Sequence, residues 1–325
     1  MIRAVIPRRL SNMTQPVLVA DVGASTTRVA LARKDGSLDA VRSFANDEVE
    51  DLAILLAGAL GQTMPGRPAV CVLAVAGPID GDRVTLTNRS WSFSRRGLAR
   101  KLKLKRLVVV NDFVAVAHAL PALGPADLVS VGGGRGEARA TLLACGPGTG
   151  FGVGVLQRAG RRSHALASEA GHMRFGAATA DEARIVAHLV REHGPVAVED
   201  LLSGPGLVRL HRMLSNEQSS PEAIVAAARA GKSKARATTD FFLRLFGRIA
   251  GDLALAFDAR GGVYLAGGLG RALAPLVSSS PFRAAFEEHP PYENRLASIP
   301  THVIVHSVPG LIGAAELARS FARQS

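Results

Sequence analysis

The stretch "RLVVVNDFVAVAHAL", residues 106–120, joins a compact apolar run to a segment with helical periodicity, and Asn111 and Asp112 stand at the junction. A short apolar run that leads into a helix is the repeating unit of α/β proteins. Polar residues at the carboxyl end of such a strand commonly face a ligand crevice. They also commonly do no more than cap the next helix. The stretch alone leaves both interpretations open.

Apolar runs and helical patterns alternate along the rest of the chain. We expect strands at 17–21, 28–32, 69–77, 106–110, 262–270 and 301–307, and helices at 47–61, 114–120, 181–193, 237–257 and 309–324. Pro205 suits the first turn of a further helix. This alternation predicts an α/β fold with much parallel sheet.

One pattern occurs twice. Setting Ala20 against Ala144 aligns a strand, a turn of small residues and a second strand at 17–32 with the same elements at 140–156. The match indicates two halves built on one plan, each with a hairpin turn that faces a shared ligand. Hairpins of this kind are common, so the repeat supports this interpretation without proving it.

Composition narrows the class of protein. With 325 residues and 47% hydrophobic content, the chain can bury a large core and is expected to form two domains. The net charge of +12 comes from scattered arginines, since only six of the 39 basic residues are lysine. Aromatic residues, at 5%, are too sparse for a base-stacking platform. We therefore expect attraction for small anions and no nucleic-acid partner.

The cysteines and the apolar runs indicate the compartment. Cys71 and Cys145 lie in strand-like runs and are expected to be buried, reduced thiols. No apolar run reaches the roughly 18 residues of a membrane span, and residues 1–16 read as an extension without a secretory signal. A cytoplasmic protein with no membrane partner is expected.

The glycine-rich stretch "CGPGTGFGVG" fits neither the dinucleotide-binding spacing nor the P-loop. Gly148, Thr149 and Gly150 remain, between two strands, where the backbone N–H groups can approach an anion. A plain hairpin is the alternative. Asp21, at the first hairpin, would suit a Mg²⁺ ion between its carboxylate and a phosphate, although Asp is also a common turn residue.

Taken together, these residues resemble the bacterial glucokinases of the hexokinase/actin-like ATPase superfamily. The similarity extends from about Val17 to Ala318. It rests on eight blocks in the family's order, which are "DVGASTTRVAL", "AVAGPIDGDRVTLTNRSWSFS", "VVNDFVAVAHALP", "GPGTGFGVGVL", "SEAGHMRF", "VEDLLSGPGL", "GGVYLAGGLG" and "FRAAFEEHPPYENRLASIPTHVIVHSVPGLIGAA".

The resemblance implies a two-domain actin-like ATPase (ribonuclease H-like) fold with mixed sheets flanked by helices and a ligand cleft between the domains. Residues 17–122 and 311–325 would form a small domain and residues 123–310 a large one, with the last helix returning to the small domain. The implied reaction is the first step of glycolysis, in which ATP and D-glucose give ADP and glucose 6-phosphate. A homodimer is implied as well.

The resemblance also assigns roles to residues. Asp112 would be the general base that accepts the proton of the sugar 6-hydroxyl, a role that an ordinary carboxylate can fill in phosphoryl transfer. The sugar-binding residues would be Asn111, Asp112, Glu169, His172 and Glu199. Carboxylates suit a polyol because each oxygen accepts from a hydroxyl, while histidine can donate or accept. Taken alone, His172 could equally be a satisfied core histidine.

The cofactors implied are ATP and Mg²⁺. Asp21 would hold Mg²⁺ through a water. The residues expected to contact ATP are Asp21, Gly23, Ala24, Ser25, Thr26, Gly148, Thr149, Gly150, Gly267 and Gly268, the last two by the adenosine. For that glycine pair, a routine turn after a strand is the alternative.

The sequence departs from the family pattern at a few positions. Ala24 and Ser25 replace a Gly and a Thr of the first hairpin, and Ala24 would cost about 1 kcal/mol if its φ had to be positive. Ala170 replaces a Gly, and Met173-Arg174 replaces Val-Asp, beside the expected sugar-binding residues. These changes put sugar specificity and catalytic rate in question.

Three hypotheses follow. An active ATP-dependent glucokinase leads, because Asp112 and the other motif residues are all present. A sugar-sensing regulatory protein that binds glucose but phosphorylates it poorly comes second, motivated by Ala24. The third is a kinase for another hexose, such as mannose or an amino sugar.

Overall fold

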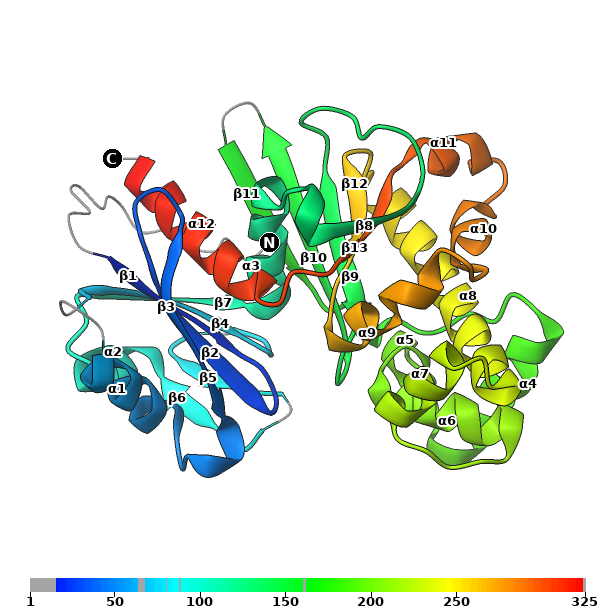
Figure 1. Ribbon diagram of the computed structural model, residues 1–325, viewed down its shortest axis with the longest axis horizontal. Helices are drawn as coiled ribbons and strands as arrows, with labels where there is room; N and C mark the ends of the chain where they lie inside the picture. The colour runs from blue at the N-terminus through cyan, green and yellow to red at the C-terminus, as the bar shows by residue number, and fades with distance from the viewer. Residues whose placement is uncertain (1–15, 64–67, 80, 88, 160–161, 324–325) are drawn as a thin grey trace. The chain divides into compact units, whose positions relative to one another are not determined.

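The computed structural model describes residues 16–63, 68–79, 81–87, 89–159 and 162–323. The chain forms two compact units (Figure 1). The first unit contains the chain up to Ala122 together with the C-terminal segment from Ser307 onward. The second unit runs from Leu123 to His306. The C-terminal segment therefore belongs to the same unit as the first strand.

The first unit contains a five-stranded mixed sheet in the order β3-β2-β1-β4-β7. Strands β1, β2 and β3 are antiparallel neighbours, whereas β4 and β7 continue the sheet in parallel with β1. The five strands are β1 (Val17–Val22), β2 (Thr26–Ala32), β3 (Leu38–Ala45), β4 (Val70–Val75) and β7 (Arg106–Asn111). A separate two-stranded sheet pairs β5 (Arg83–Thr85) with β6 (Ser92–Ser94).

Helices cover both faces of this five-stranded sheet. Alternate residues of β1 point to opposite faces, so Leu18 packs with α1 (Leu52–Thr63) and α2 (Arg95–Lys101). Val17 and Val19 pack instead with α12 (Pro309–Arg323). Helix α12 also crosses α3 (Asp112–Ala119) so closely that a Cβ on Gly313 would lie 1.6 Å from the carbonyl oxygen of Ala115. Figure 1 shows α12, in red, beside α3.

The second unit repeats the plan of the first. Its six-stranded sheet has the order β11-β10-β9-β12-β13-β8. Strands β9, β10 and β11 are antiparallel neighbours, and β12 and β13 follow in parallel with β9, as β4 and β7 follow β1. The strands are β8 (Leu128–Gly132), β9 (Leu142–Pro147), β10 (Phe151–Ala159), β11 (Arg162–Ser168), β12 (Gly262–Leu265) and β13 (Thr301–Ile304). The predicted internal repeat is thus present in the topology.

Most helices belong to the second unit. They are α4 (Ala180–His193), α5 (Val198–Leu201), α6 (Gly204–Ser215), α7 (Pro221–Arg229), α8 (Ser233–Ala256), α9 (Gly268–Val277), α10 (Phe282–Glu287) and α11 (Glu293–Ser298). Short 3-10 turns lie at Asn46–Glu48 (η1), Leu120–Ala122 (η2), Pro125–Asp127 (η3) and Ala170–His172 (η4). The long helix α8 buries Phe242 and Phe246 against one face of the sheet.

Several boundaries differ from the sequence-based ones. The helix predicted at 47–61 begins only at Leu52, because η1 precedes it and the side chain of Asp51 accepts the N–H of Ile54 at 2.7 Å. The strand predicted at 262–270 ends at Leu265, and a helix begins at Gly268. Gly267, with a φ of +87°, makes the turn between them.

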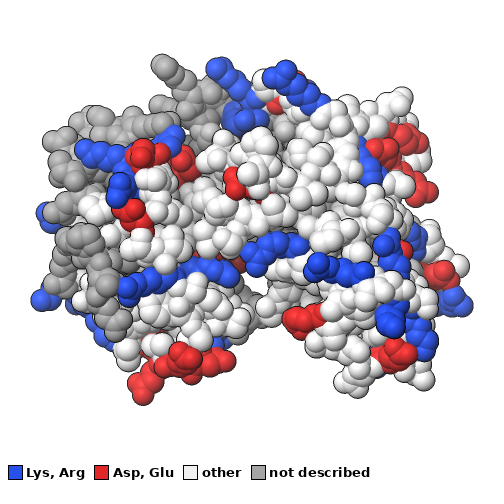
Figure 2. All heavy atoms as spheres, viewed as in Figure 1, with Lys and Arg blue, Asp and Glu red and all other residues white. Residues whose placement is uncertain are grey.

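The surface carries mixed charge. On the face shown in Figure 2, each unit has acidic and basic side chains interspersed among uncharged ones. Both cysteines are buried and unbridged, as predicted. In the portion of the chain that the structure describes, no helix is both long and apolar enough to traverse a lipid bilayer.

Candidate functional site

The Asn111-Asp112 junction is the end of β7 and the start of α3. Asn111 is the N-cap of α3, and its Oδ1 accepts the N–H groups of Phe113 and Val114 at 2.9 and 3.3 Å. Asp112 is the first helical residue, and its Oδ1 also accepts the Phe113 N–H, at 2.9 Å. The cap therefore belongs to Asn111, and the carboxylate of Asp112 lies at the positive end of the helix, where negative charge is favoured.

Asp21 lies near the end of β1, directly opposite Arg28 of β2. Burial raises the pKa of the Asp21 carboxyl above its usual value, and the nearby Arg28 offsets part of that rise. The carboxylate also meets the first turn of α12, because a Cβ on Gly310 would lie 2.5 Å from its Oδ2. The returning C-terminal helix therefore forms one wall of the surroundings of Asp21.

The turn between β1 and β2 is short. Gly23 N–H donates to the carbonyl oxygen of Thr26 at 3.0 Å. Among the described residues, five non-glycine residues have a positive φ, and Ala24 is not one of them. Ala24 therefore causes no left-handed strain in this hairpin, and the cost considered from the sequence does not arise.

In the second unit, three polar side chains predicted to bind sugar lie together. His172 is in the middle, with Nδ1 3.5 Å from Oε1 of Glu199 and Nε2 3.9 Å from Oε2 of Glu169. Glu169 and His172 are more than half exposed, and Glu199 is about one-third exposed (62%, 56% and 32%). An imidazole between two accessible carboxylates can donate and accept hydrogen bonds, as a polyol requires. A satisfied core histidine would not be exposed in this way.

Backbone contacts hold this group in place. Glu169 precedes η4, and the His172 N–H donates to its carbonyl oxygen at 2.9 Å. Gly171 must be a glycine, because a Cβ there would lie 2.3 Å from the carbonyl oxygen of Phe151. The N–H of Val198 donates to the Met173 carbonyl at 2.9 Å and so brings α5, which carries Glu199, against this loop. Ala170 is buried and does not have a positive φ.

The loop from Gly148 to Gly150 joins β9 to β10. The carbonyl of Gly148 accepts the N–H of Gly204, at the start of α6, at 2.8 Å. Because the carbonyl and the following N–H of a trans peptide point in opposite directions, the N–H of Thr149 points away from α6. The ring of Phe151 packs edge-on against Phe246 of α8, with centroids 5.7 Å apart. The loop is therefore fixed at both ends, and Thr149 is exposed between them.

Gly267 and Gly268 lie at the turn between β12 and α9. A Cβ on Gly267 would lie 2.3 Å from the carbonyl oxygen of Pro147, whereas a Cβ on Gly268 would meet no atom within 4 Å. Gly267 thus allows β12 to approach the end of β9, and Gly268 leaves open space at the start of the helix. Gly268 is therefore the position at which a ligand could approach the backbone.

The structure divides the predicted residues between the units. Asp21, Gly23–Thr26, Asn111 and Asp112 belong to the first unit, and Gly148–Gly150, Glu169, His172, Glu199, Gly267 and Gly268 belong to the second. Sequence reasoning missed Asn46 and Arg89, whose side chains both hydrogen-bond the hairpin carbonyls. Arg89 lies within one of the family blocks, but no pattern singled it out. Asn46 lies in none of them.

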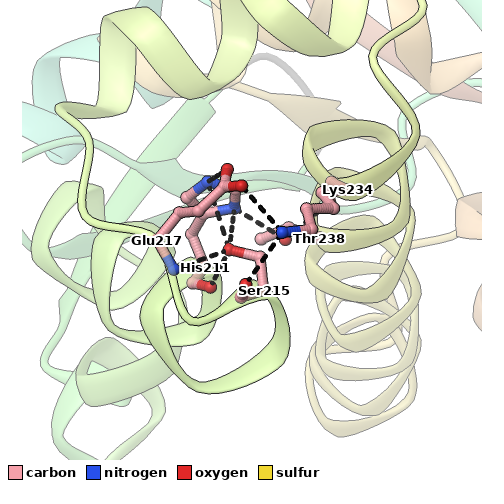
Figure 3. Close-up of polar contacts among 5 residues, drawn as sticks. All are labelled: His211, Ser215, Glu217, Lys234 and Thr238. Atoms are coloured by element: carbon pink, nitrogen blue, oxygen red, sulfur yellow. Dashed lines mark hydrogen bonds and ion pairs between the residues drawn. The ribbon is translucent and has the colours of Figure 1, made fainter.

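A second polar cluster occurs between α6 and α8 (Figure 3). His211 Nδ1 lies 2.9 Å from Thr238 Oγ1, and its Nε2 lies 3.7 Å from Glu217 Oε2. The other carboxylate oxygen of Glu217 pairs with Lys234 Nζ at 2.8 Å. This arrangement resembles a hydrolase triad in composition. However, His211 is 3% exposed and Thr238 is fully buried, so no substrate reaches the hydroxyl. The cluster joins the two helices and is structural.

The shared plan of the two units, with a glycine-containing hairpin in each, defines the class of protein as one with the actin-like ATPase fold. The Glucokinase family model matches residues 18–321. The glucokinase of Paramagnetospirillum magneticum is 40% identical over 314 residues, which are 94% of this chain and 98% of that protein. The chain belongs to the glucokinase family and is a glucose kinase by that membership.

Solved structures agree with this assignment. The crystal structure of glucokinase from an Antarctic psychrotroph superposes with a TM-score of 0.83 at 30% identity, covering 94% of this chain and 99% of that one. A ROK family glucokinase from Streptomyces griseus, solved with glucose and AMPPNP, has a TM-score of 0.65 at 20% identity and covers 94% of this chain and all of that one. At that identity, the second likeness supports the fold alone.

Proposed function

We propose that this protein transfers the γ-phosphoryl group of ATP to the 6-hydroxyl of D-glucose, as the first step of glycolysis. The products are glucose 6-phosphate and ADP. The observation that carries the proposal is the accessible group formed by Glu169, His172 and Glu199, whose acceptors and donors suit the hydroxyls of a sugar. Membership of the glucokinase family supports the same substrate.

Asp112 would accept the proton of the 6-hydroxyl as that oxygen attacks phosphorus. Phosphoryl transfer depends mainly on positioning and on stabilising charge, so a fixed carboxylate is sufficient as the base. The N-terminus of α3 fixes Asp112, because its Oδ1 accepts the Phe113 N–H. The amide of Asn111 keeps Oδ1 on the helix, while its Nδ2 lies 3.5 Å from the Gly77 carbonyl and would donate to a neighbouring hydroxyl.

The ring hydroxyls would bind in the second unit. Glu169 and Glu199 would each accept from a hydroxyl, and His172 between them would donate or accept. Replacing water by several such bonds orients the sugar and so favours one hydroxyl over the others as nucleophile.

The phosphates of ATP would bind at the Gly23–Thr26 hairpin and at the Gly148–Gly150 loop, whose N–H groups suit anions. Gly267 and Gly268 would lie by the adenosine. Asp21 fits a role with Mg²⁺, because this ion takes one or two carboxylates and completes its shell with water and phosphate oxygens. When bound, the ion would neutralise charge on the transferring phosphate.

A coupled assay with glucose, ATP and Mg²⁺ tests the proposal. We expect turnover by the wild type and a fall in kcat of roughly 10²- to 10⁴-fold in Asp112→Asn, which keeps the size of the side chain but removes the base. Calorimetry should show that Asp112→Asn still binds glucose. No turnover by the wild type, or full turnover by the variant, would contradict the assignment.

The two other hypotheses have less support. The sugar-sensor hypothesis rested on strain at Ala24, and no positive φ occurs there. A kinase for another hexose remains to be distinguished by comparing kcat/KM for glucose, mannose and an amino sugar, and we expect glucose to give the highest value. We also propose a homodimer, which light scattering on the purified protein would test.

A further inference from the structure

Three consecutive carbonyl groups of the β1–β2 hairpin are held from one side. The Nδ2 of Asn46 donates to the carbonyl oxygens of Gly23 and Ala24 at 2.9 and 3.2 Å. The backbone N–H of the same Asn46 donates to the carbonyl of Ser25 at 2.9 Å. Asn46, the residue that follows β3, therefore donates hydrogen bonds to the carbonyl groups of all three turn residues, Gly23, Ala24 and Ser25.

Asn46 is itself fixed. Its side chain is fully buried, and its Oδ1 accepts the hydroxyl proton of Thr27, which is also fully buried, at 2.7 Å. The carbonyls of Gly23 and Ala24 determine which end of the amide is the donor, because a carbonyl oxygen can only accept, so the NH₂ group faces the hairpin and Oδ1 is left to accept from Thr27. A buried amide with all of these partners satisfied has one orientation only.

Arg89 holds the same turn, also on its carbonyl side. Its Nη1 lies 3.3 Å from the Ala24 carbonyl, and its Nη2 lies 2.6 Å from the Asn46 carbonyl. Asp47 pairs with Nη1 at 2.7 Å, and the guanidinium carbon lies 4.4 Å from the ring centre of Trp91. The side chain is 16% exposed, so most of its freedom is already lost in the fold.

The direction of the carbonyls determines the direction of the N–H groups. The peptides of the turn are trans, and in a planar trans peptide the carbonyl of one residue points opposite to the N–H of the next. With the carbonyls of Gly23, Ala24 and Ser25 turned toward Asn46, the N–H groups of Ala24, Ser25 and Thr26 point the other way. Successive N–H groups on one side of a turn make a concave site for an anion.

We propose that Asn46 and Arg89 are positioning residues for the polyphosphate of the nucleotide. They hold the hairpin by its carbonyl groups, so that its N–H groups point away from both side chains. The inference rests on the proposed function, in which this hairpin binds the β- and γ-phosphates. Neither side chain touches the phosphates. Both remove the conformational cost that a free turn would meet on binding.

The two residues contribute in different ways. Asn46 supplies three of the hydrogen bonds and belongs to the core, so its replacement also tests the fold. Arg89 is a fork that reaches two carbonyl oxygens at once, which a lysine cannot do from a single ammonium group. Arg89→Lys keeps the positive charge without the fork and therefore separates positioning from simple attraction of an anion.

The test measures binding of MgATP and of glucose by calorimetry, together with melting temperature and steady-state kinetics. The variants are Asn46→Asp, Thr27→Val, Arg89→Gln and Arg89→Lys. Arg33→Gln is the matched control, because Arg33 lies just beyond β2, pairs with the exposed Asp39, and its side chain makes no hydrogen bond to the described hairpin. Should Asn46→Asp fail to fold, Thr27→Val and the two Arg89 variants carry the test.

We expect the Kd for MgATP to rise about three- to tenfold in Thr27→Val and in both Arg89 variants, and more in folded Asn46→Asp. The KM for ATP should rise in parallel, while the Kd for glucose stays within twofold of wild type. Arg33→Gln should match the wild type throughout.

Two outcomes would overturn the inference. Folded variants that bind MgATP like the wild type would show that the contacts serve the fold alone. Recovery of wild-type affinity in Arg89→Lys would show that charge, and not positioning, matters. If the wild type phosphorylates glucose normally and the Arg89 variants bind MgATP as tightly as the wild type does, only this inference is contradicted. If the wild type itself does not bind MgATP, the proposed function is contradicted as well.

Discussion

A Cβ on Gly150 would lie 2.6 Å from Oε2 of Glu199, although the two residues are far apart in the sequence. The same oxygen accepts the N–H of Phe151 at 3.3 Å, and the other carboxylate oxygen faces His172. One side chain therefore contacts both the proposed phosphate loop and the proposed sugar group. The glycine gives the carboxylate the space to do so.

Gly150→Ala should disturb both sites of the second unit. The added methyl group would push the carboxylate of Glu199 away from Phe151 and His172, since 2.6 Å is well below van der Waals contact. We expect kcat/KM for glucose to fall by about tenfold or more, with the KM values for glucose and ATP both raised, as steady-state kinetics would show.

Gly176→Ala is the matched control for this substitution. A Cβ at Gly176 meets no atom within 4 Å, and its φ is not positive. Kinetic constants close to those of the wild type are expected for it. Equal effects of the two substitutions would mean that the contact between Gly150 and Glu199 is unimportant.

Asn111 is expected to have separable structural and binding roles. Asn111→Ala removes the N-cap of α3 and should lower the free energy of unfolding by about 0.5–2 kcal/mol. Asn111→Asp retains an oxygen that caps the helix, so its stability should stay close to that of the wild type. It lacks the amide donor, however, and should bind glucose more weakly. Denaturant unfolding and calorimetry on both variants check this. Similar glucose affinity in Asn111→Asp and wild type would argue against a contact between this amide and the sugar.

Asp21 is expected to reduce stability while supporting activity. Burial raises the pKa of its carboxyl above 3.8, so the folded state binds the proton more tightly than the unfolded state does. Its ionisation therefore disfavours folding. The free energy of unfolding falls as the pH rises from 3.8, the ordinary pKa of the carboxyl, through the raised pKa of the folded state. Asp21→Asn should melt at a higher temperature than the wild type at pH 7, with roughly 2–4 °C gained per kcal/mol.

The stability gain in Asp21→Asn should diminish as the pH falls toward 3.8, where the wild-type carboxyl is itself protonated. Turnover with MgATP should meanwhile decrease by about 100-fold or more, because the neutral amide of asparagine no longer offers a negative charge to Mg²⁺. Calorimetric melting across pH and a coupled assay measure the two effects. A variant less stable than the wild type at pH 7 would contradict the argument.

The two cysteines should be unreactive in the native protein. Burial raises the pKa of Cys71 and of Cys145 to about 12, and both side chains are fully buried. Thiolate, the reactive form, is therefore scarce at pH 8. We expect a chromogenic disulfide reagent to react with neither thiol until denaturant is added, and then with both. Rapid reaction without denaturant would show that the strands β4 and β9 open readily.

Local patterns in the sequence were enough to predict the α/β class and the repeated hairpins. The apolar runs at 17–21 and 106–110 became the strands β1 and β7, since a short apolar run bounded by polar or turn residues is typical of a strand in an α/β sheet. Boundaries were less certain. Residues 47–51 read as helix by periodicity, but a 3-10 turn and the cap at Asp51 delay α1 to Leu52.

The sequence by itself determined the family, because the motif residues stand in one order along the chain, and it nominated Asp112, Glu169, His172 and Glu199 through those motifs. Only the tertiary structure decided that Asn111 is the cap and Asp112 is not, and that Ala24 is unstrained, because both depend on torsion angles that no motif specifies. The tertiary structure alone also showed that Asn46 lies against the hairpin and Glu199 against Gly150. Such contacts join segments distant in the chain, and their geometry is determined by the packing of strands and helices between them.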